Sequence, residues 1–463
     1  MKKNSINSQT FYNTLSTTVL SGISFITLPI FTNLLNTEQY GRYSIFTTWL
    51  SILLPIMCLQ SYTCLSVARY DYHDSYSEFK RNNMILGTVS CALFTIVGII
   101  FKDPISKLLN FPSSIIIVMF VYAFANYVIS LLQTIFTYEK KAEYNFYISL
   151  FLAIVTSILS YYLITKIEFN NLYEGRIYGM FIPYIIIALI IWPILFIKNK
   201  GKIKFSYWKY SIAYGIPIVF HLIFHEVLSQ SNKLMLEYMG YAGATVGIFS
   251  LFQTITSVLS IIVNALNSSW VPFYFDDLNE NAKERLSSKI KNYVELVTVL
   301  FIGFLLLSRE VCYILSNESY MQGIDIIPLL VIPIFLMYMY QFPVNFEYFC
   351  KKTKMISVGT ICSGIVNIVA NYFLIPKYGM YGSCFSTIIS YFVLFIVHFV
   401  IAKNIKDKKF DISLKDFILP LFFIGISIMC FYFLKDLWVV RWVAGAAIGI
   451  YELIKVIKRK TIF

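Results

Sequence analysis

The stretch SIIIVMFVYAFANYVISLLQTIFT, residues 114–137, contains no charged side chain. A bilayer-spanning helix needs about 20 consecutive, mostly apolar residues, and this stretch is long enough to form one. Thirteen further mostly apolar stretches precede or follow it: 11–35, 43–66, 84–101, 147–165, 177–197, 210–232, 244–271, 292–313, 324–349, 355–375, 381–402, 416–434 and 438–456. We therefore predict an all-α polytopic membrane protein with about fourteen transmembrane helices.

The composition agrees with this prediction. Hydrophobic residues make up 58% of the 463 residues and charged residues 14%, whereas soluble domains contain roughly 45–50% apolar and about 25% charged residues. The first apolar run is too long for a cleaved signal peptide and has no Ala-x-Ala-like site, so we expect an uncleaved first span. The segments between spans are short, which leaves no room for a soluble catalytic domain.

The basic residues predict the orientation of the chain. If the N-terminus lies inside, all but ten of the 38 lysines and arginines fall on the inner side, as the positive-inside rule requires. We therefore expect a bacterial cytoplasmic (inner) membrane protein with both termini cytoplasmic. The net charge of +13 is explained by anionic inner-leaflet lipids, so nucleic acid is not expected as a partner. The ten outer basic residues are Arg42, Lys102, Lys107, Lys166, Arg176, Lys233, Arg309, Lys377, Lys435 and Arg441.

Three short motifs recur in the same order at nearly constant offsets. The pairs are Tyr-Gly-Arg-Tyr-Ser-Ile-Phe (40–46) with Val-Gly-Ile-Phe-Ser-Leu-Phe (246–252), Tyr-Glu-Lys-Lys (138–141) with Phe-Cys-Lys-Lys (349–352), and Arg-Ile-Tyr-Gly (176–179) with Gly-Met-Tyr-Gly (379–382). Six spans separate each motif from its copy, so both copies face the same way, as in a parallel repeat. We predict two six-helix lobes and an added helix pair, at 1–203, 204–403 and 404–463.

Four stretches carry a resemblance to a known family: Asn-Thr-Leu…Glu-Gln-Tyr-Gly-Arg-Tyr-Ser (13–44), Tyr-Gly-Ile-Pro (214–217), Ser-Asn-Lys-Leu-Met-Leu (231–236) and Ile-Pro-Lys-Tyr-Gly-Met-Tyr-Gly-Ser (375–383). With them the chain resembles the polysaccharide flippases, the O-antigen and capsule repeat-unit translocases of the multidrug/oligosaccharidyl-lipid/polysaccharide exporter superfamily. The likeness covers most of the chain. In one departure, Asn232 precedes Lys233 where the family often has an acidic residue.

The resemblance implies a flippase that moves undecaprenyl-diphosphate-linked oligosaccharide repeat units across the membrane by alternating access. Such a protein is not an enzyme and needs no cofactor. Its partners would be the lipid-linked substrate and membrane lipids, with a proton or sodium as candidate coupling ion and the polysaccharide polymerase machinery as a candidate partner. Alternatives in the same fold are a cation-coupled multidrug exporter and a lipid II flippase. A membrane polymerase or glycosyltransferase is more distant; Asp276 and Asp277 fit a solvated surface helix better than a catalytic acidic pair.

The seventh predicted span carries the densest polar set inside an apolar run. Glu226, Gln230 and Lys233 follow one another at i, i+4 and i+7 and share a helix face, with His221 and His225 beside them. We predict that Lys233 attracts phosphate, and that Glu226 with a histidine exchanges a proton. The alternatives are interfacial snorkelling of Lys233, a static ion pair at Glu226 and packing roles for the histidines. No HExxH motif or third ligand supports a metal site.

Three arginines are candidate stations for an anionic sugar diphosphate, because guanidinium binds phosphate bidentately. Arg42 and Arg309 lie near predicted outer span ends, and Arg69 near an inner one. Interfacial anchoring is the alternative for each. Amide side chains inside spans fit interhelical contacts better than sugar binding; they are Asn13, Asn126, Gln133, Asn264, Asn267, Gln341, Asn345, Asn367 and Asn371.

Overall fold

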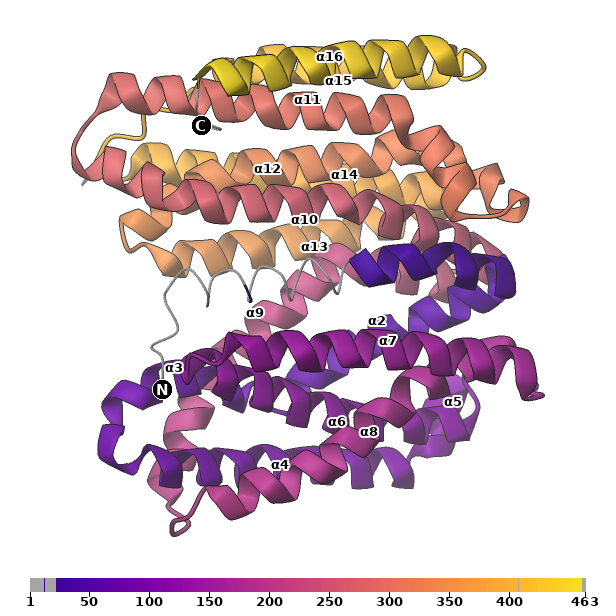
Figure 1. Ribbon diagram of the computed structural model, residues 1–463, viewed down its shortest axis with the longest axis vertical. Coiled ribbons are helices and arrows are strands. Elements are labelled where there is room, and N and C mark those ends of the chain that lie inside the picture. Colours follow the sequence, from indigo (N-terminus) through magenta and orange to yellow (C-terminus); the bar gives the residue numbers. More distant parts are fainter. Residues whose placement is uncertain (1–11, 13–21, 407, 460–463) are drawn as a thin grey trace. The chain divides into compact units, whose positions relative to one another are not determined.

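A computed structural model describes residues 12, 22–406 and 408–459 of the chain, and these residues form helices and no strand (Figure 1). The all-α prediction is therefore confirmed for this part of the chain. The chain divides into two compact units, residues 1–226 and 227–463. The division falls inside one long helix, α9 (Phe205–Tyr238).

The first unit is built from apolar helices of bilayer length. Its second predicted span consists of α2 and α3 with a break between them. The elements before α9 are Gly22–Leu34, α2 (Thr37–Met57), η1 (Ser61–Cys64), α3 (Leu65–Asp71), η2 (His73–Ser75), α4 (Tyr76–Ile100), α5 (Lys102–Leu109), α6 (Ser113–Tyr138), α7 (Ala142–Lys166) and α8 (Leu172–Lys198). The short α5 buries none of its residues.

The break in the second span has identifiable causes. Pro55 interrupts the hydrogen bonding of the last turn of α2. Leu59 and Gln60 then take left-handed backbone conformations, with φ of 52° and 45°, which non-glycine residues seldom adopt. The two helical pieces meet at 56°. Gln60 is 3% exposed, so the irregular backbone lies inside protein, as membrane depth requires.

The second unit follows α9 and ends in a helix pair packed on α11. Its elements are α10 (Gly243–Asn279), α11 (Lys283–Leu315), η3 (Glu318–Ile326), α12 (Ile327–Phe349), α13 (Thr353–Tyr378), α14 (Met380–Asn404), α15 (Lys415–Phe433) and α16 (Trp438–Arg459). Both α15 and α16 contact α11 (Figure 1). The fully buried Arg441 fastens α16, because its guanidinium donates to the Leu306 carbonyl at 2.7 Å and pairs with Glu310 of α11.

Each unit pairs its corresponding helices in the same way. In the first unit α8 packs on α6 and α7, and in the second α14 packs on α12 and α13. The Lys-Lys motifs form the same turn in both units. Lys140 and Lys351 each have φ of 59°, and the next amide closes a six-residue turn, Lys141 to Phe136 and Lys352 to Glu347. These are helix ends of the Schellman type.

The glycines of the Tyr-Gly motifs also have the same structural role in both units. A Cβ added at Gly179 would lie 2.3 Å from the Oγ and 2.4 Å from the Cα of Ser160 on α7. A Cβ added at Gly382 would lie 2.3 Å from the carbonyl oxygen of Leu374 on α13. Both glycines therefore let a helix approach the backbone of the preceding one, which small residues permit in membrane bundles.

We expect Gly382→Val to lower the thermal stability of the detergent-solubilised protein markedly. The obstructing atoms belong to backbone, which cannot rotate away, and overpacking a tight contact costs about 1–3 kcal/mol or more. Gly425→Ala on α15 is the matched control, since no atom lies within 4 Å of its added Cβ. Fluorescence-detected size exclusion after heating measures both. Equal melting temperatures for Gly382→Val and the wild type would contradict the close approach of α14 to α13.

Eleven helices in the described residues are long and apolar enough to span a membrane, and the bent pair α2 and η1–α3 makes twelve. The first predicted span, 11–35, lies partly outside the described residues, and within it Gly22–Leu34 is a shorter apolar helix. α16 is helical over the predicted fourteenth span but is not among the eleven. The multi-pass architecture is confirmed, whereas the count of fourteen stays a prediction.

Candidate functional site

Glu226 lies well inside the membrane-spanning helix α9 and reaches α2. Its Oε2 accepts a hydrogen bond from the Ser51 hydroxyl at 3.1 Å. The same hydroxyl contacts the Thr48 carbonyl at 2.8 Å, so Ser51 is held against its own helix. A carboxylate at membrane depth is costly and marks a functional position by default. The contact shows that one wall of its environment is the polar face of α2.

The two histidines predicted beside Glu226 have different surroundings. His221 is half-buried and its Nδ1 has no hydrogen-bond partner in the described part of the chain. His225 is exposed. Both stand on α9, where His225 immediately precedes Glu226 and His221 lies five residues before it. Sequence spacing therefore found two imidazoles near the carboxyl group, but it could not say which of them is open to its surroundings.

The helix break beneath α2 is a polar centre that the sequence reasoning missed. Asn83 of α4 donates to the carbonyl of the fully buried Ser61 at 2.7 Å and to the hydroxyl of Ser211 on α9 at 3.1 Å. The carbonyl oxygen of Leu59 lies against Gly215 of α9. These contacts satisfy backbone groups freed by the break, as in the discontinuous helices of transporters. The sequence signal was Pro55 followed by a run of polar residues.

Arg42 lies in the second turn of α2, at the end that the charge bias assigns to the outer side. Its guanidinium carbon is 4.4 Å from the centroid of the Phe111 ring, a cation–π distance. It lines a cavity of about 500 Å³ between the start of α2, the end of α5 and the start of α8. Arg69 stands in the last turn of α3, where a cation complements the helix dipole.

Lys233 belongs to the second unit and is 8% exposed. Next to it, Asn232 joins a network of neutral amides and hydroxyls. Asn371 donates to the Asn232 oxygen at 2.7 Å and to the Asn367 oxygen at 2.9 Å, and Asn232 donates to Thr387 Oγ1 at 2.6 Å. The network fastens α9 to α13 and α14. Asn232, which departs from the family pattern, therefore connects helices through hydrogen bonds to neutral side chains.

Other amides behave in the same way. Gln341 and Asn345 of α12 donate to Asn264 and Asn267 of α10 at 2.9 and 2.8 Å. These amides make the interhelical contacts favoured by the sequence analysis. Asn13 lies outside the described residues. In the described residues no group of three or more His, Cys, Asp or Glu side chains is placed to hold a metal ion.

Arg309 of α11 is held inside the second unit. Its Nη1 lies 3.6 Å from an oxygen of Asp325, and its guanidinium carbon lies 5.1 Å from the centroid of the Phe431 ring on α15. Arg309 therefore helps to attach α15 to α11. This contact adds a structural role to the predicted phosphate station.

A fully buried acid–base pair in the second unit was also missed. His398 Nδ1 of α14 lies 2.8 Å from Glu347 Oε1 of α12, and both side chains are 0% exposed. The Tyr340 ring stacks on the imidazole at 6.0 Å, and Nε2 faces Gly359 of α13. The available signal was a carboxyl group and an imidazole within apolar runs near inner span ends. Nothing local in the sequence pairs residues 51 positions apart.

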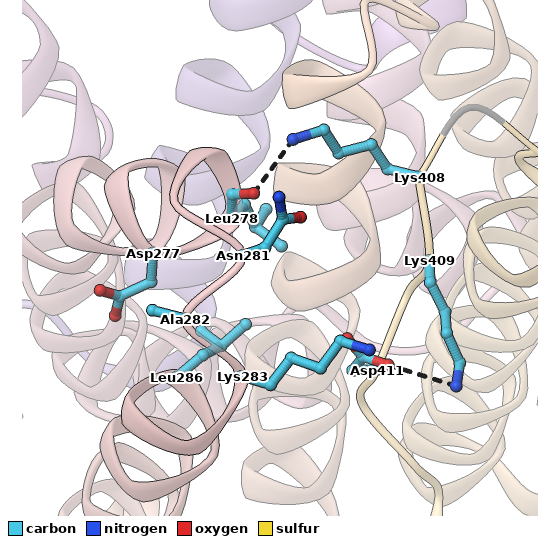
Figure 2. A pocket seen from close by; sticks show the side chains of 9 residues that line it. All are labelled: Asp277, Leu278, Asn281, Ala282, Lys283, Leu286, Lys408, Lys409 and Asp411. Carbon is cyan, nitrogen blue, oxygen red and sulfur yellow. Dashed lines mark hydrogen bonds and ion pairs between the residues drawn. The ribbon is translucent and has the colours of Figure 1, made fainter.

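The turn between α10 and α11 borders a second cavity of about 220 Å³ (Figure 2). Asp277 is 1% exposed and pairs with Arg285 at 2.5 Å and Lys289 at 2.8 Å, so it is a buried ion-paired residue. Of the two aspartates, only Asp276 is exposed as predicted for a solvated helix, and the prediction is wrong for Asp277. Lys408 donates to the Leu278 carbonyl at 3.1 Å and so attaches the α14–α15 linker to this turn.

Comparisons with known proteins agree with this architecture. Residues 6–276 match the model of the family described as "Polysaccharide biosynthesis protein". "Lsg locus putative protein 1" of Haemophilus influenzae is 22% identical over 395 residues, which cover 80% of this chain and 93% of that protein. An "Uncharacterized membrane protein" of the same organism is 24% identical over 365 residues, covering 75% and 85% of the two chains.

Two solved structures show the fold. The lipid II flippase MurJ in an inward closed conformation superposes with a TM-score of 0.69 at 12% identity, over 97% of this chain and 98% of that one. An inward-facing MATE family multidrug resistance transporter of the MOP superfamily superposes with a TM-score of 0.64 at 15% identity, over 85% and 94%. The fold is thus shared with membrane transporters of that superfamily. Because the family model matches more than half of the residues, the chain belongs to the polysaccharide biosynthesis protein family.

Proposed function

We propose that this protein is a flippase of surface-polysaccharide biosynthesis. It moves undecaprenyl-diphosphate-linked oligosaccharides, such as O-antigen or capsule repeat units, from the inner to the outer leaflet of a bacterial cytoplasmic membrane, with both termini cytoplasmic. The observation that carries the proposal is the family match over residues 6–276 in a chain that shares its fold with transporters along nearly its whole length. Translocation breaks no covalent bond, so the protein acts as a transporter and not as an enzyme.

The proposed coupling residue is Glu226. A carboxyl group that alternates between its protonated and ionised forms changes its interaction with Ser51, because the ionised form is the stronger acceptor. Imidazole is the side chain whose ordinary pKa lies nearest neutrality, and His221 and His225 stand on the same helix as Glu226. They are the proposed proton relay. Sodium is the alternative coupling ion.

The proposed phosphate stations are Arg42, Arg69, Arg309 and Lys233. Each contributes a cation to one of the two units, and charge-assisted hydrogen bonds to phosphate are about twice as strong as neutral ones. In an alternating-access cycle the sugar head moves through the protein while the prenyl tail stays in lipid. The candidate partners outside the substrate are membrane lipids and the polysaccharide polymerase machinery.

Gene deletion with fractionation of lipid-linked sugars tests the proposal. We expect complete lipid-linked repeat units to accumulate on the inner leaflet of the deletion strain, where added glycosidases cannot reach them in intact spheroplasts. Expression of the gene from a plasmid should restore the access of glycosidases to the lipid-linked units. Absence of any complete unit would point to an enzyme of assembly. A normal distribution of units together with drug hypersensitivity would instead point to the multidrug exporter.

A further inference from the structure

The outer-side cavity of the first unit has a lining that none of the comparisons describes. Its volume is about 500 Å³, within the range of roughly 300–1,000 Å³ that is typical of small-ligand sites. Eight of its ten lining residues carry a polar or charged side-chain group. They are Glu38, Gln39, Arg42, Ser106, Lys107, Asn110, Asn171 and Tyr173, beside Phe111 and Pro112.

The walls of this cavity are held in place by contacts of their own. The Phe111 amide donates to the Ser106 carbonyl at 3.2 Å, closing the turn after α5. Asn110 in that turn adopts φ of 53°, and its side chain is exposed. The Tyr173 amide donates to Gln39 Oε1 at 3.0 Å, which ties α8 to α2. The cavity therefore has fixed sides from three helices.

Two aromatic side chains at the base of the cavity hold the Arg42 guanidinium in position. Phe111 and Tyr173 are 2% and 4% exposed, and their ring centroids lie 6.0 Å apart in an edge-to-face arrangement. The Arg42 guanidinium lies over the Phe111 ring and interacts with the Tyr173 side chain. A stacked guanidinium loses little freedom when it binds an anion, so the site is preorganised.

The position of α5 places the cavity at the level of lipid headgroups. Leu108 is 77% exposed, whereas the neighbouring Ser106 and Lys107 line the cavity. A short helix with an exposed apolar residue beside charged ones is typical of the membrane interface. The cavity thus opens where a headgroup, and not an acyl chain, would reside.

We propose that this cavity binds a phosphate-bearing polyhydroxyl head, with Arg42 and Lys107 on the phosphate and Asn110 and Asn171 on hydroxyls. Two cations and one carboxylate, Glu38, leave the lining with a net positive charge, and the amides both donate and accept hydrogen bonds, as sugar hydroxyls require. Two sources share this chemistry: the glycosyl phosphate of a translocated glycolipid and the glycerol phosphate of an anionic lipid. The first source rests on the proposed function.

Direct binding tests the site without requiring transport. The full chain is placed in phosphatidylcholine nanodiscs, and radiolabelled glucose 1-phosphate is measured by equilibrium dialysis. We expect saturable binding that Lys107→Gln and Arg42→Gln each weaken about tenfold, the loss of one charge-assisted contact. Lys102→Gln is the matched control, because Lys102 stands on the same helix outside the cavity lining. Lys107 is exposed, so its variant preserves the fold.

The outcomes separate the sources and the two proposals. Binding that survives in nanodiscs containing phosphatidylglycerol identifies a saccharide phosphate, whereas binding lost there identifies the lipid headgroup. No saturable binding, or equal weakening by Lys102→Gln, would overturn the site. Failure of the deletion strain to accumulate lipid-linked units would refute the flippase but leave the binding result standing. Accumulation without glucose 1-phosphate binding would refute the cavity alone.

Discussion

Replacing His398 with leucine is expected to destabilise the protein more than any other single change considered above. The substitution leaves the Glu347 carboxyl group fully buried without its 2.8 Å partner. Removing one member of a buried pair costs about 3–5 kcal/mol. We expect loss of most monodisperse protein in detergent at 37 °C, measured by fluorescence-detected size exclusion, with a large fall in melting temperature.

The double variant Glu347→Leu/His398→Leu is the informative control. Replacing both members with apolar side chains of similar volume is often neutral or stabilising, so the double variant should recover most of the lost stability. Additive losses in the double-mutant cycle would show that the pair does not couple α12 to α14. Recovery of stability without recovery of complementation in the deletion strain would show that the pair also serves transport.

The second large effect is expected for transport. Glu226→Gln should reduce translocation at least tenfold and remove its dependence on a pH gradient, because glutamine keeps the shape and accepts from Ser51 but cannot exchange a proton. The measurement is flipping of a fluorescent lipid-linked oligosaccharide in proteoliposomes with an imposed pH gradient. Glu226→Asp should keep part of the activity.

Two comparisons make this result specific. Glu168→Gln changes an exposed carboxylate in the loop between α7 and α8 and should leave transport unchanged. Ser51→Ala removes the donor at 3.1 Å and should shift the pH profile while transport persists. Wild-type flux of Glu226→Gln at every pH would remove Glu226 from the coupling mechanism.

Much of the architecture follows from local properties of the sequence. Apolar runs of bilayer length predicted the helices, since each run satisfies its backbone hydrogen bonds within itself. The recurring sequence motifs also predicted structural similarity between the two units. The structure shows the same turn at Lys140 and Lys351 and the same close approach at Gly179 and Gly382. Glycine at these positions permits the close approach of two helices, whereas lysine seldom adopts the left-handed conformation of the turn, so only the recurrence of the Lys-Lys pair pointed to that turn.

The candidate site was predicted less completely. The seventh span was recognised as polar, but the partner of Glu226 is Ser51, 175 residues earlier. The break at Leu59 and Gln60 depends on Asn83 and on α9 to satisfy the freed backbone. Asp277 was expected in solvent and is buried among cations. Each of these features arises from contacts between helices distant in sequence.

The sequence by itself determined that the chain is helical and crosses the membrane many times, because burial in lipid constrains every apolar segment separately. Only the tertiary structure decided which polar groups meet, including His398 with Glu347 and Arg42 with Phe111. A polar side chain inside a span must find a partner on another helix, and helix packing determines which partner is within reach.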